Sequence, residues 1–131
     1  MKYMILIYGN PENWGHPAFL RTPEAMTMPG QQRDQLTTQF VQLMEEIHGS
    51  GELVGTEALA DPVNTVTVRV RGGLPATTDG PYLESKEQLA GYFVVDCHSQ
   101  ERATEIASRF PNAMFGAVEV RPVMDMSRRE L

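Results

Sequence analysis

The sequence predicts a single α+β domain, a ferredoxin-like two-layer sandwich with two main helices on one face of an antiparallel sheet. Three observations support this class. The chain has 131 residues, of which 41% are apolar, so residues 1–131 can form one domain with its own core. Two segments carry apolar residues at helical spacing, and short strand-like segments lie around them. Two helices cover only one face of a sheet, so the other face is predicted to be open.

The composition argues against several classes of function. The formal net charge is −6 and the basic residues do not cluster, so we expect no binding to nucleic acid or to membranes. The first apolar run is too short to span a membrane and lacks a signal-peptide cleavage site. Cys97 is the one cysteine, so an internal disulfide cannot form. A cytoplasmic location is the resulting expectation.

The first part of the chain predicts a strand, a long loop and a helix. Residues 2–8 are apolar on both faces, which is typical of a central strand. Residues 9–28 are rich in Gly and Pro and predict a long loop, with a short helical turn favoured at Thr22-Pro23-Glu24. Residues 30–48 have the clearest helical pattern.

The middle of the chain predicts strands. Residues 53–59 form the second strand, and residues 65–71 alternate between valines on one face and polar residues on the other. Gly72-Gly73 predicts a turn into a short strand at 75–78. Residues 92–97 predict another apolar strand.

The last part predicts a helix and a closing strand. Ser99 can cap a helix that extends through Phe110 and ends at Pro111. Residues 117–123 predict the final strand.

The open face of the sheet is predicted to be mixed in character. Its polar positions would be Thr65, Thr67, Arg69, Arg71, Glu119 and Arg121, beside apolar residues of other strands. Such a face is suited to pack on a second copy of itself, which predicts a homodimer that encloses a partly polar cleft. The alternative is an ordinary solvated face with weak cross-strand ion pairs.

The turn at Asp79-Gly80-Pro81 is the main candidate for a site. A rigid turn can hold the Asp79 carboxylate near the cleft, where it can serve as an acid or base or bind a ligand. The alternative is a plain surface turn. Arg69 and Arg71 are candidates to bind a small polar or anionic ligand, with Tyr3, Tyr8 and Tyr82 as hydrogen-bonding groups.

The long loop adds two weaker candidates, Trp14 and His16. Trp14 can stack on a ligand or can anchor the loop to the core, and His16 is a catalytic candidate only if it reaches Asp79. Cys97 and His98 point to opposite sides of a strand, and the other histidines are distant in sequence, so no metal site is expected. Glycine-rich phosphate motifs are absent from the sequence, so no nucleotide cofactor is expected.

The residues around the Asp79 turn resemble a known family motif. The run Asp79-Gly80-Pro81-Tyr82, followed by Ser85-Lys86-Glu87-Gln88-Leu89-Ala90-Gly91-Tyr92, resembles that of YCII-related proteins of the DGPF type. Tyr82 stands in place of the Phe and Ala90 in place of the first Gly. Residues 2–9, 55–59, 68–71 and 117–123 also resemble strands of that family. The resemblance implies a ferredoxin-like subunit that dimerises as an α+β barrel, in a family whose members mostly have no established activity.

The resemblance also implies two other kinds of function. Some YCII relatives are proposed enzymes, including a dehydrochlorinase, with a His–Asp pair. The Asp would correspond to Asp79, but the His position falls near Gln39 or Phe40, so His16 or His48 would have to replace it. DGPF-type proteins are also associated with extracytoplasmic-function sigma factors. We therefore expect a small-molecule-binding homodimer, with a lyase-like enzyme or a sigma-factor interaction module as alternatives.

Overall fold

A four-stranded antiparallel sheet forms the centre of the protein. The computed structural model describes residues 1–10, 14, 23–83 and 87–127. Its strands are β1 (Lys2–Gly9), β2 (Leu53–Ala58), β5 (Gln88–Asp96) and β6 (Val118–Pro122), in the order β2-β5-β1-β6. The strand predicted at 2–8 is therefore central, as expected.

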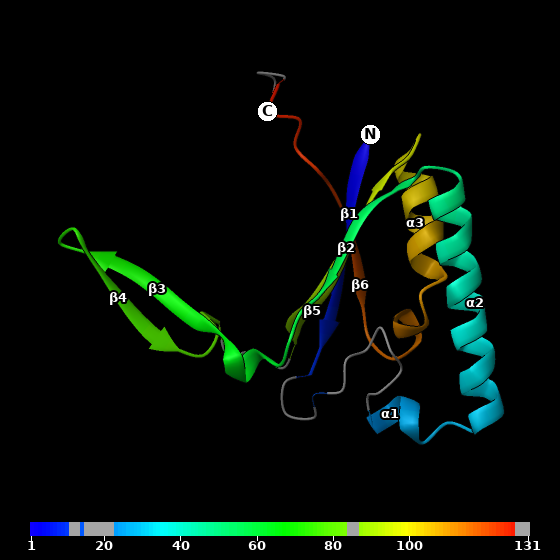
Figure 1. The fold of residues 1–131 in the computed structure, drawn as a ribbon, viewed down its shortest axis with the longest axis horizontal. Coiled ribbons are helices and arrows are strands. Elements are labelled where there is room, and N and C mark those ends of the chain that lie inside the picture. The colour runs from blue at the N-terminus through cyan, green and yellow to red at the C-terminus, as the bar shows by residue number, and fades with distance from the viewer. Residues whose placement is uncertain (11–13, 15–22, 84–86, 128–131) are drawn as a thin grey trace.

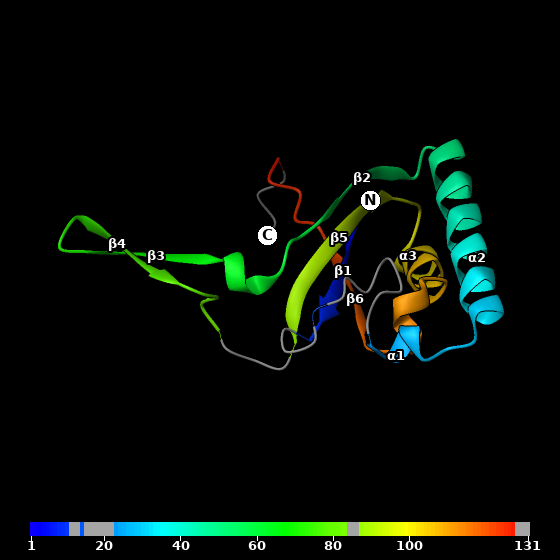
Figure 2. The same cartoon turned by 60° about the horizontal axis from the view of Figure 1, so that its bottom comes forward.

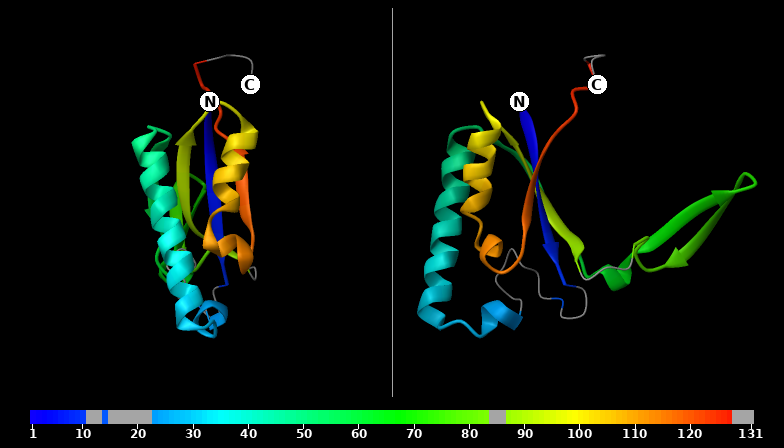
Figure 3. Two further views of the ribbon diagram at one scale, coloured as in Figure 1. Left: turned by 90° about the vertical axis from the view of Figure 1, so that its right-hand side faces the viewer. Right: turned by 180° about the vertical axis from the view of Figure 1, so that it is seen from behind.

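Two main helices cover one face of this sheet. These are α2 (Gly30–Gly49) and α3 (Gln100–Ser108), which lie side by side in Figures 1 and 3. The chain order β1-α2-β2-β5-α3-β6 is the βαββαβ order of the ferredoxin-like fold, so the predicted fold class is confirmed. Three short helices, α1 (Pro23–Met26), η3 (Pro62–Asn64) and η4 (Pro111–Met114), occur in the connections. None of the helices described is long and apolar enough to cross a membrane.

The core lies between the sheet and the two helices. On β1, the buried residues Tyr3, Ile5 and Ile7 alternate with half-buried neighbours, because every second side chain points to the helices. The rings of Phe40, Phe93 and Phe110 meet edge to face, with centroids 4.8–6.1 Å apart. The sheet therefore buries one face and leaves the other open in the single chain.

The prediction that residues 65–71 belong to the main sheet is wrong. Among the described residues, β3 (Val66–Arg71) pairs only with β4 (Leu74–Asp79), and the two strands form a separate two-stranded sheet. We call residues 66–79 the arm. It extends from the body on the side away from the helices (Figures 1 and 2). The place beside β2 in the main sheet is taken by β5, which begins at Gln88, four residues earlier than predicted. This pairing leaves β3 outside the main sheet.

The arm exposes the side chains that its alternating pattern predicted to be buried. Val66, Val68 and Val70 are 55%, 59% and 66% exposed. Alternation identifies a strand and its two faces, but it does not identify what covers the apolar face. The segment predicted as a short strand at 75–78 is the full six-residue strand β4.

Candidate functional site

The open face of the main sheet has an apolar centre. Met4 pairs with Val94, and Leu6 pairs with Tyr92, across β1 and β5. These four side chains are half buried, because they point away from the helices and cover one another only in part. An apolar surface of this kind on one side of a sheet is typical of an interaction face.

Polar groups border this apolar centre along β6. Glu119 lies opposite Leu6, and Arg121 lies opposite Met4, so both side chains share the open face. Tyr8 lies on the same face of β1, and its hydroxyl lies close to the Glu119 carboxylate. Glu57 of β2, opposite Tyr92, marks the other margin of the face.

The environment of Tyr8 keeps its hydroxyl protonated. Partial burial raises the pKa of the Tyr8 phenol, and the hydrogen bond to Glu119 and the negative charge of that carboxylate raise it further. Arg121 acts in the opposite direction but with a smaller effect. At neutral pH, Tyr8 is therefore a hydrogen-bond donor and not a base.

A hollow of ≈ 490 Å³ lies beside this pair, lined by Tyr8, Glu87, Gly116, Ala117 and Glu119. Its volume is in the range of small-molecule sites. A larger hollow of ≈ 850 Å³ is lined only by residues 30–39 of α2, so we interpret it as the outer surface of one helix. The hollow at Tyr8 is the better candidate because two strands meet there and supply both polar and apolar walls.

The predicted grouping of Asp79 with the two arginines is not formed. In the register of the arm, Arg69 and Arg71 lie opposite Ala76 and Leu74, whereas Asp79 lies opposite Val66. Directly paired residues share a face, so the carboxylate projects from the valine face and the guanidinium groups project from the other. The interpretation that these three residues share one face of the main sheet is therefore corrected.

The Asp79-Gly80-Pro81 turn closes the base of the arm. Gly80 has a φ of 95°, which favours glycine, and its N–H donates to the Thr65 carbonyl at 2.7 Å. The Thr67 hydroxyl donates to the Gly80 carbonyl, also at 2.7 Å. The Asp79 side chain is exposed, and within the described part of the chain no hydrogen bond or ion pair holds its carboxylate.

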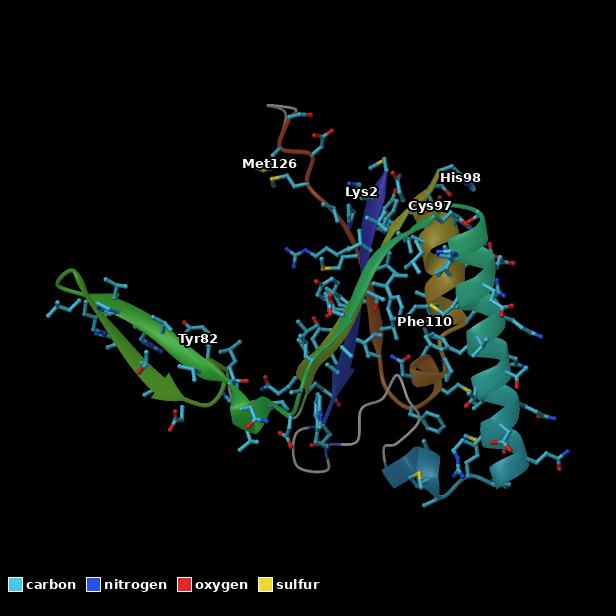
Figure 4. All side chains as sticks on the ribbon, in the orientation of Figure 1. Lys2, Tyr82, Cys97, His98, Phe110 and Met126 are labelled. Atoms are coloured by element: carbon cyan, nitrogen blue, oxygen red, sulfur yellow. The ribbon has the colours of Figure 1, made fainter. Side chains whose placement is uncertain are left out.

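Tyr82 lies on the arm side of the molecule and contacts Arg69. The Arg69 guanidinium carbon lies 5.3 Å from the centre of the Tyr82 ring, a cation–π distance. Tyr82 is 70% exposed, so the pair stands in solvent in the single chain. The structure therefore joins two predicted ligand-binding residues on the side of the arm (Figure 4), and neither residue lines the Tyr8 hollow.

The remaining predicted residues are dispersed. Tyr3 is buried in the core with its hydroxyl near the Met1 sulfur, on the face opposite Tyr8. Trp14 packs against the core, as the anchor interpretation predicts. His16 lies outside the described residues. His48 is in the last turn of α2, away from the arm. Within the described ranges, no three His, Cys, Asp or Glu side chains are grouped as metal ligands.

Comparisons with known proteins show which family the chain belongs to. The YCII-related domain family matches residues 1–127, so the chain belongs to that family. The chain is also similar to the uncharacterized protein R00369 of Rhizobium meliloti (strain 1021), with 36% identity over 76 residues. That match covers 56% of this chain and 61% of the relative's length. The comparisons therefore establish the family, and the function has to be argued from the structure.

The Tyr8–Glu119 pair is the feature that sequence reasoning missed. Tyr8 was predicted as a hydrogen-bonding group and Glu119 as a polar position of the open face, but the two are 111 positions apart and were not paired. The signal was available in the βαββαβ order, which places the first and last strands side by side. An alignment of β1 with β6 in this order would have placed Tyr8 and Glu119 on the same face of the sheet.

Proposed function

We propose that this protein is a homodimer that binds a small polar organic molecule at the Tyr8–Glu119 hollow. The observation that carries the proposal is that Tyr8 and Glu119, from neighbouring strands, line one hollow of ≈ 490 Å³ on the open sheet face. The apolar centre of that face supports a dimer, because a second sheet packed there would bury Met4, Leu6, Tyr92 and Val94.

The chemistry of the hollow favours a ligand that donates hydrogen bonds. Glu119 brings a carboxylate to its wall, and this carboxylate would repel an anion. The expected anionic ligand depended on Arg69 and Arg71, which lie on the arm. We therefore retain the polar ligand and replace the anion by a neutral or cationic molecule with N–H or O–H groups.

Three probes of nearly equal shape test this chemistry: benzamide, benzamidine and benzoate. In nuclear magnetic resonance titrations, we expect benzamide and benzamidine to shift the amide signals of Gly116 and Ala117, which line the hollow. Benzoate should shift them least, because the Glu119 carboxylate opposes its charge. Stronger shifts with benzoate than with benzamide would contradict the proposed ligand class.

Tyr8→Phe then tests the role of the hydroxyl. Loss of one hydrogen bond of about 1 kcal/mol should weaken benzamide binding roughly fivefold. Tyr82→Phe is the matched control, because it removes a hydroxyl from an exposed ring outside the hollow and should leave binding unchanged. Equal effects of the two substitutions would overturn the assignment of Tyr8. Light scattering during size-exclusion chromatography measures the oligomeric state independently of ligand binding.

Asp79 is not part of this proposed binding site. His48 belongs to the helical layer and His98 directly precedes α3, whereas Asp79 lies on the arm on the other side of the sheet (Figure 4). The described residues thus provide no His–Asp pair at Asp79. We accordingly propose ligand binding without a catalytic step.

A further inference from the structure

The register of the arm shows which backbone groups of β3 point outward. The Gly80 N–H donates to the Thr65 carbonyl at 2.7 Å, and this pair continues the register of β3 with β4. In an antiparallel ladder, hydrogen-bonded pairs alternate with pairs that are not hydrogen-bonded. The next pairs of the second kind place their N–H and C=O groups on the outer edge, and on β3 these belong to Val66, Val68 and Val70.

The outer edges of the two strands differ. Pro75 of β4 lies opposite Val70, at a position of the outward kind, so the N–H that it lacks is an outward one. A proline in this place is one of the ways in which natural proteins protect an edge strand. β3 contains no proline, and its register with β4 runs without a shift. The outer edge of β3 is therefore the edge that can accept a further strand.

Two arginines give this edge a positive charge. Arg69 and Arg71 alternate with the valines, so they project from the opposite face of the arm. Both are exposed, and neither forms an ion pair within the described part of the chain. The Tyr82 ring, 5.3 Å from the Arg69 guanidinium carbon, restricts that side chain without neutralising it. In a chain of net charge −6, this part of the arm is thus a local site for negative charge.

The edge and the charge together define what fits there. A strand that pairs with β3 places every second side chain beside the arginines and the others beside the valines. Carboxylates complement free guanidinium groups, and apolar side chains complement the valines, which are more than half exposed. We propose that the outer edge of β3 binds an extended peptide segment of another protein, in which acidic residues alternate with apolar ones, as a third strand of the arm.

A second copy of this chain is a poorer occupant of the same edge. Pairing of two β3 edges would bring the arginines of both copies to one face of the joined sheet, where like charges on neighbouring strands are destabilising. An acidic peptide supplies the opposite charge. A third strand also gives the arm what it lacks, since two strands alone are marginally stable in water. The inference goes beyond the ligand site at Tyr8 and does not depend on the proposed dimer.

Two synthetic peptides of equal composition test the alternation. The blocked heptapeptide TVEVEVT places both glutamates on one face of a strand, whereas TVVEEVT places them on opposite faces. In nuclear magnetic resonance titrations, we expect TVEVEVT to bind about fivefold more tightly, because only its glutamates can both meet the arginines. The amide signals of Val66, Val68 and Val70 should shift downfield as their N–H groups gain acceptors, more than that of Thr67, which belongs to a pair bonded to β4.

A matched pair of proline variants tests the edge itself. Val68→Pro removes an outward N–H from β3 and should abolish binding of TVEVEVT. Thr77→Pro removes the outward N–H of the residue opposite, on the edge of β4, and should leave binding unchanged. Circular dichroism and the amide spectrum confirm that both variants are folded.

Arginine variants test the charge. Arg69→Gln combined with Arg71→Gln should weaken binding of TVEVEVT about fivefold, as expected for two exposed ion pairs. Arg33→Gln on α2 is the control for general attraction between the peptide and a cation, and it should have no effect.

Several results would overturn the proposal. These are the absence of binding, equal binding of the two peptides, equal effects of Val68→Pro and Thr77→Pro, or an effect of Arg33→Gln as large as that of the double variant. Valine amide signals that change with protein concentration when no peptide is present would show that a second copy occupies the edge, and they would also contradict the proposal.

Discussion

Glu52 and Arg102 join β2 to α3 by a two-point ion pair. Arg102 Nε donates to Glu52 Oε2 and Nη2 donates to Oε1, both at 2.9 Å. The Ser50 hydroxyl adds a third bond to Oε1 at 2.7 Å. These bonds from Arg102, more than that from Ser50, hold the pKa of Glu52 at about 2, although burial opposes them. The pair therefore stabilises the folded chain only while Glu52 is ionised.

We predict that Glu52→Gln lowers the free energy of unfolding by about 1–2 kcal/mol at pH 7, a value reduced for solvent screening near the surface. The folded pKa of about 2 lies below the ordinary value of 4.5, so the stabilisation is present above pH 4.5. It is lost as the pH falls from 4.5 towards 2, because the unfolded chain binds the proton first. Urea denaturation of the wild-type protein and of Glu52→Gln between pH 7 and pH 2 should show that the difference between their free energies of unfolding becomes smaller.

Glu105→Gln is the matched control for this pair. Glu105 also contacts Arg102, at 3.1 Å, but its side chain is 60% exposed against 16% for Glu52. We expect a change below about 0.5 kcal/mol, as for other exposed pairs within one helix. A pH-independent difference for Glu52→Gln would show that shape, and not charge, accounts for its effect.

Pairing of β5 with β2 explains one glycine of the family motif. A Cβ atom at Gly91 would lie 2.7 Å from the Glu57 carbonyl oxygen, which is backbone and cannot move aside. We predict that Gly91→Ala costs about 1–3 kcal/mol, because the two strands must separate locally. Gly55→Ala on β2 is the control, since a Cβ there meets nothing within 4 Å. Thermal unfolding of the two variants should differ by several degrees, and equal midpoints would contradict the steric explanation.

The sequence predicted most elements and their order, and the reason lies in local patterns. Ser99 caps α3 by accepting from the Arg102 N–H at 3.1 Å, as expected from its place before an apolar helical pattern. The prediction from sequence failed for β3, because an alternating pattern identifies a strand and its two faces but not the strand with which it pairs. The site at Tyr8 was hidden for the same reason, since it depends on the long-range pairing of β1 with β6.

The whole molecule combines a packed body with an arm whose strands pair only with each other. Every strand of the body shares the core beneath α2 and α3, whereas the arm is joined to the body through the segments around Thr65 and Gly80. These two residues are hydrogen-bonded to each other, at 2.7 Å between the Gly80 nitrogen and the Thr65 oxygen. The arm can therefore be removed without opening a gap in the body.

We predict that replacing residues 66–79 by a Gly-Ser dipeptide leaves the fold of the body intact. The urea midpoint at high dilution should change little, because the valines of the arm are already exposed in the single chain. The proposed dimer packs through the open face of the main sheet, so the shortened chain should still dimerise in light scattering. Val41→Ser, an exposed apolar position on the helical layer, is the control and should not change dimerisation. A shortened chain that is folded but no longer dimerises would mean that the arms, and not the open faces, hold the two copies together.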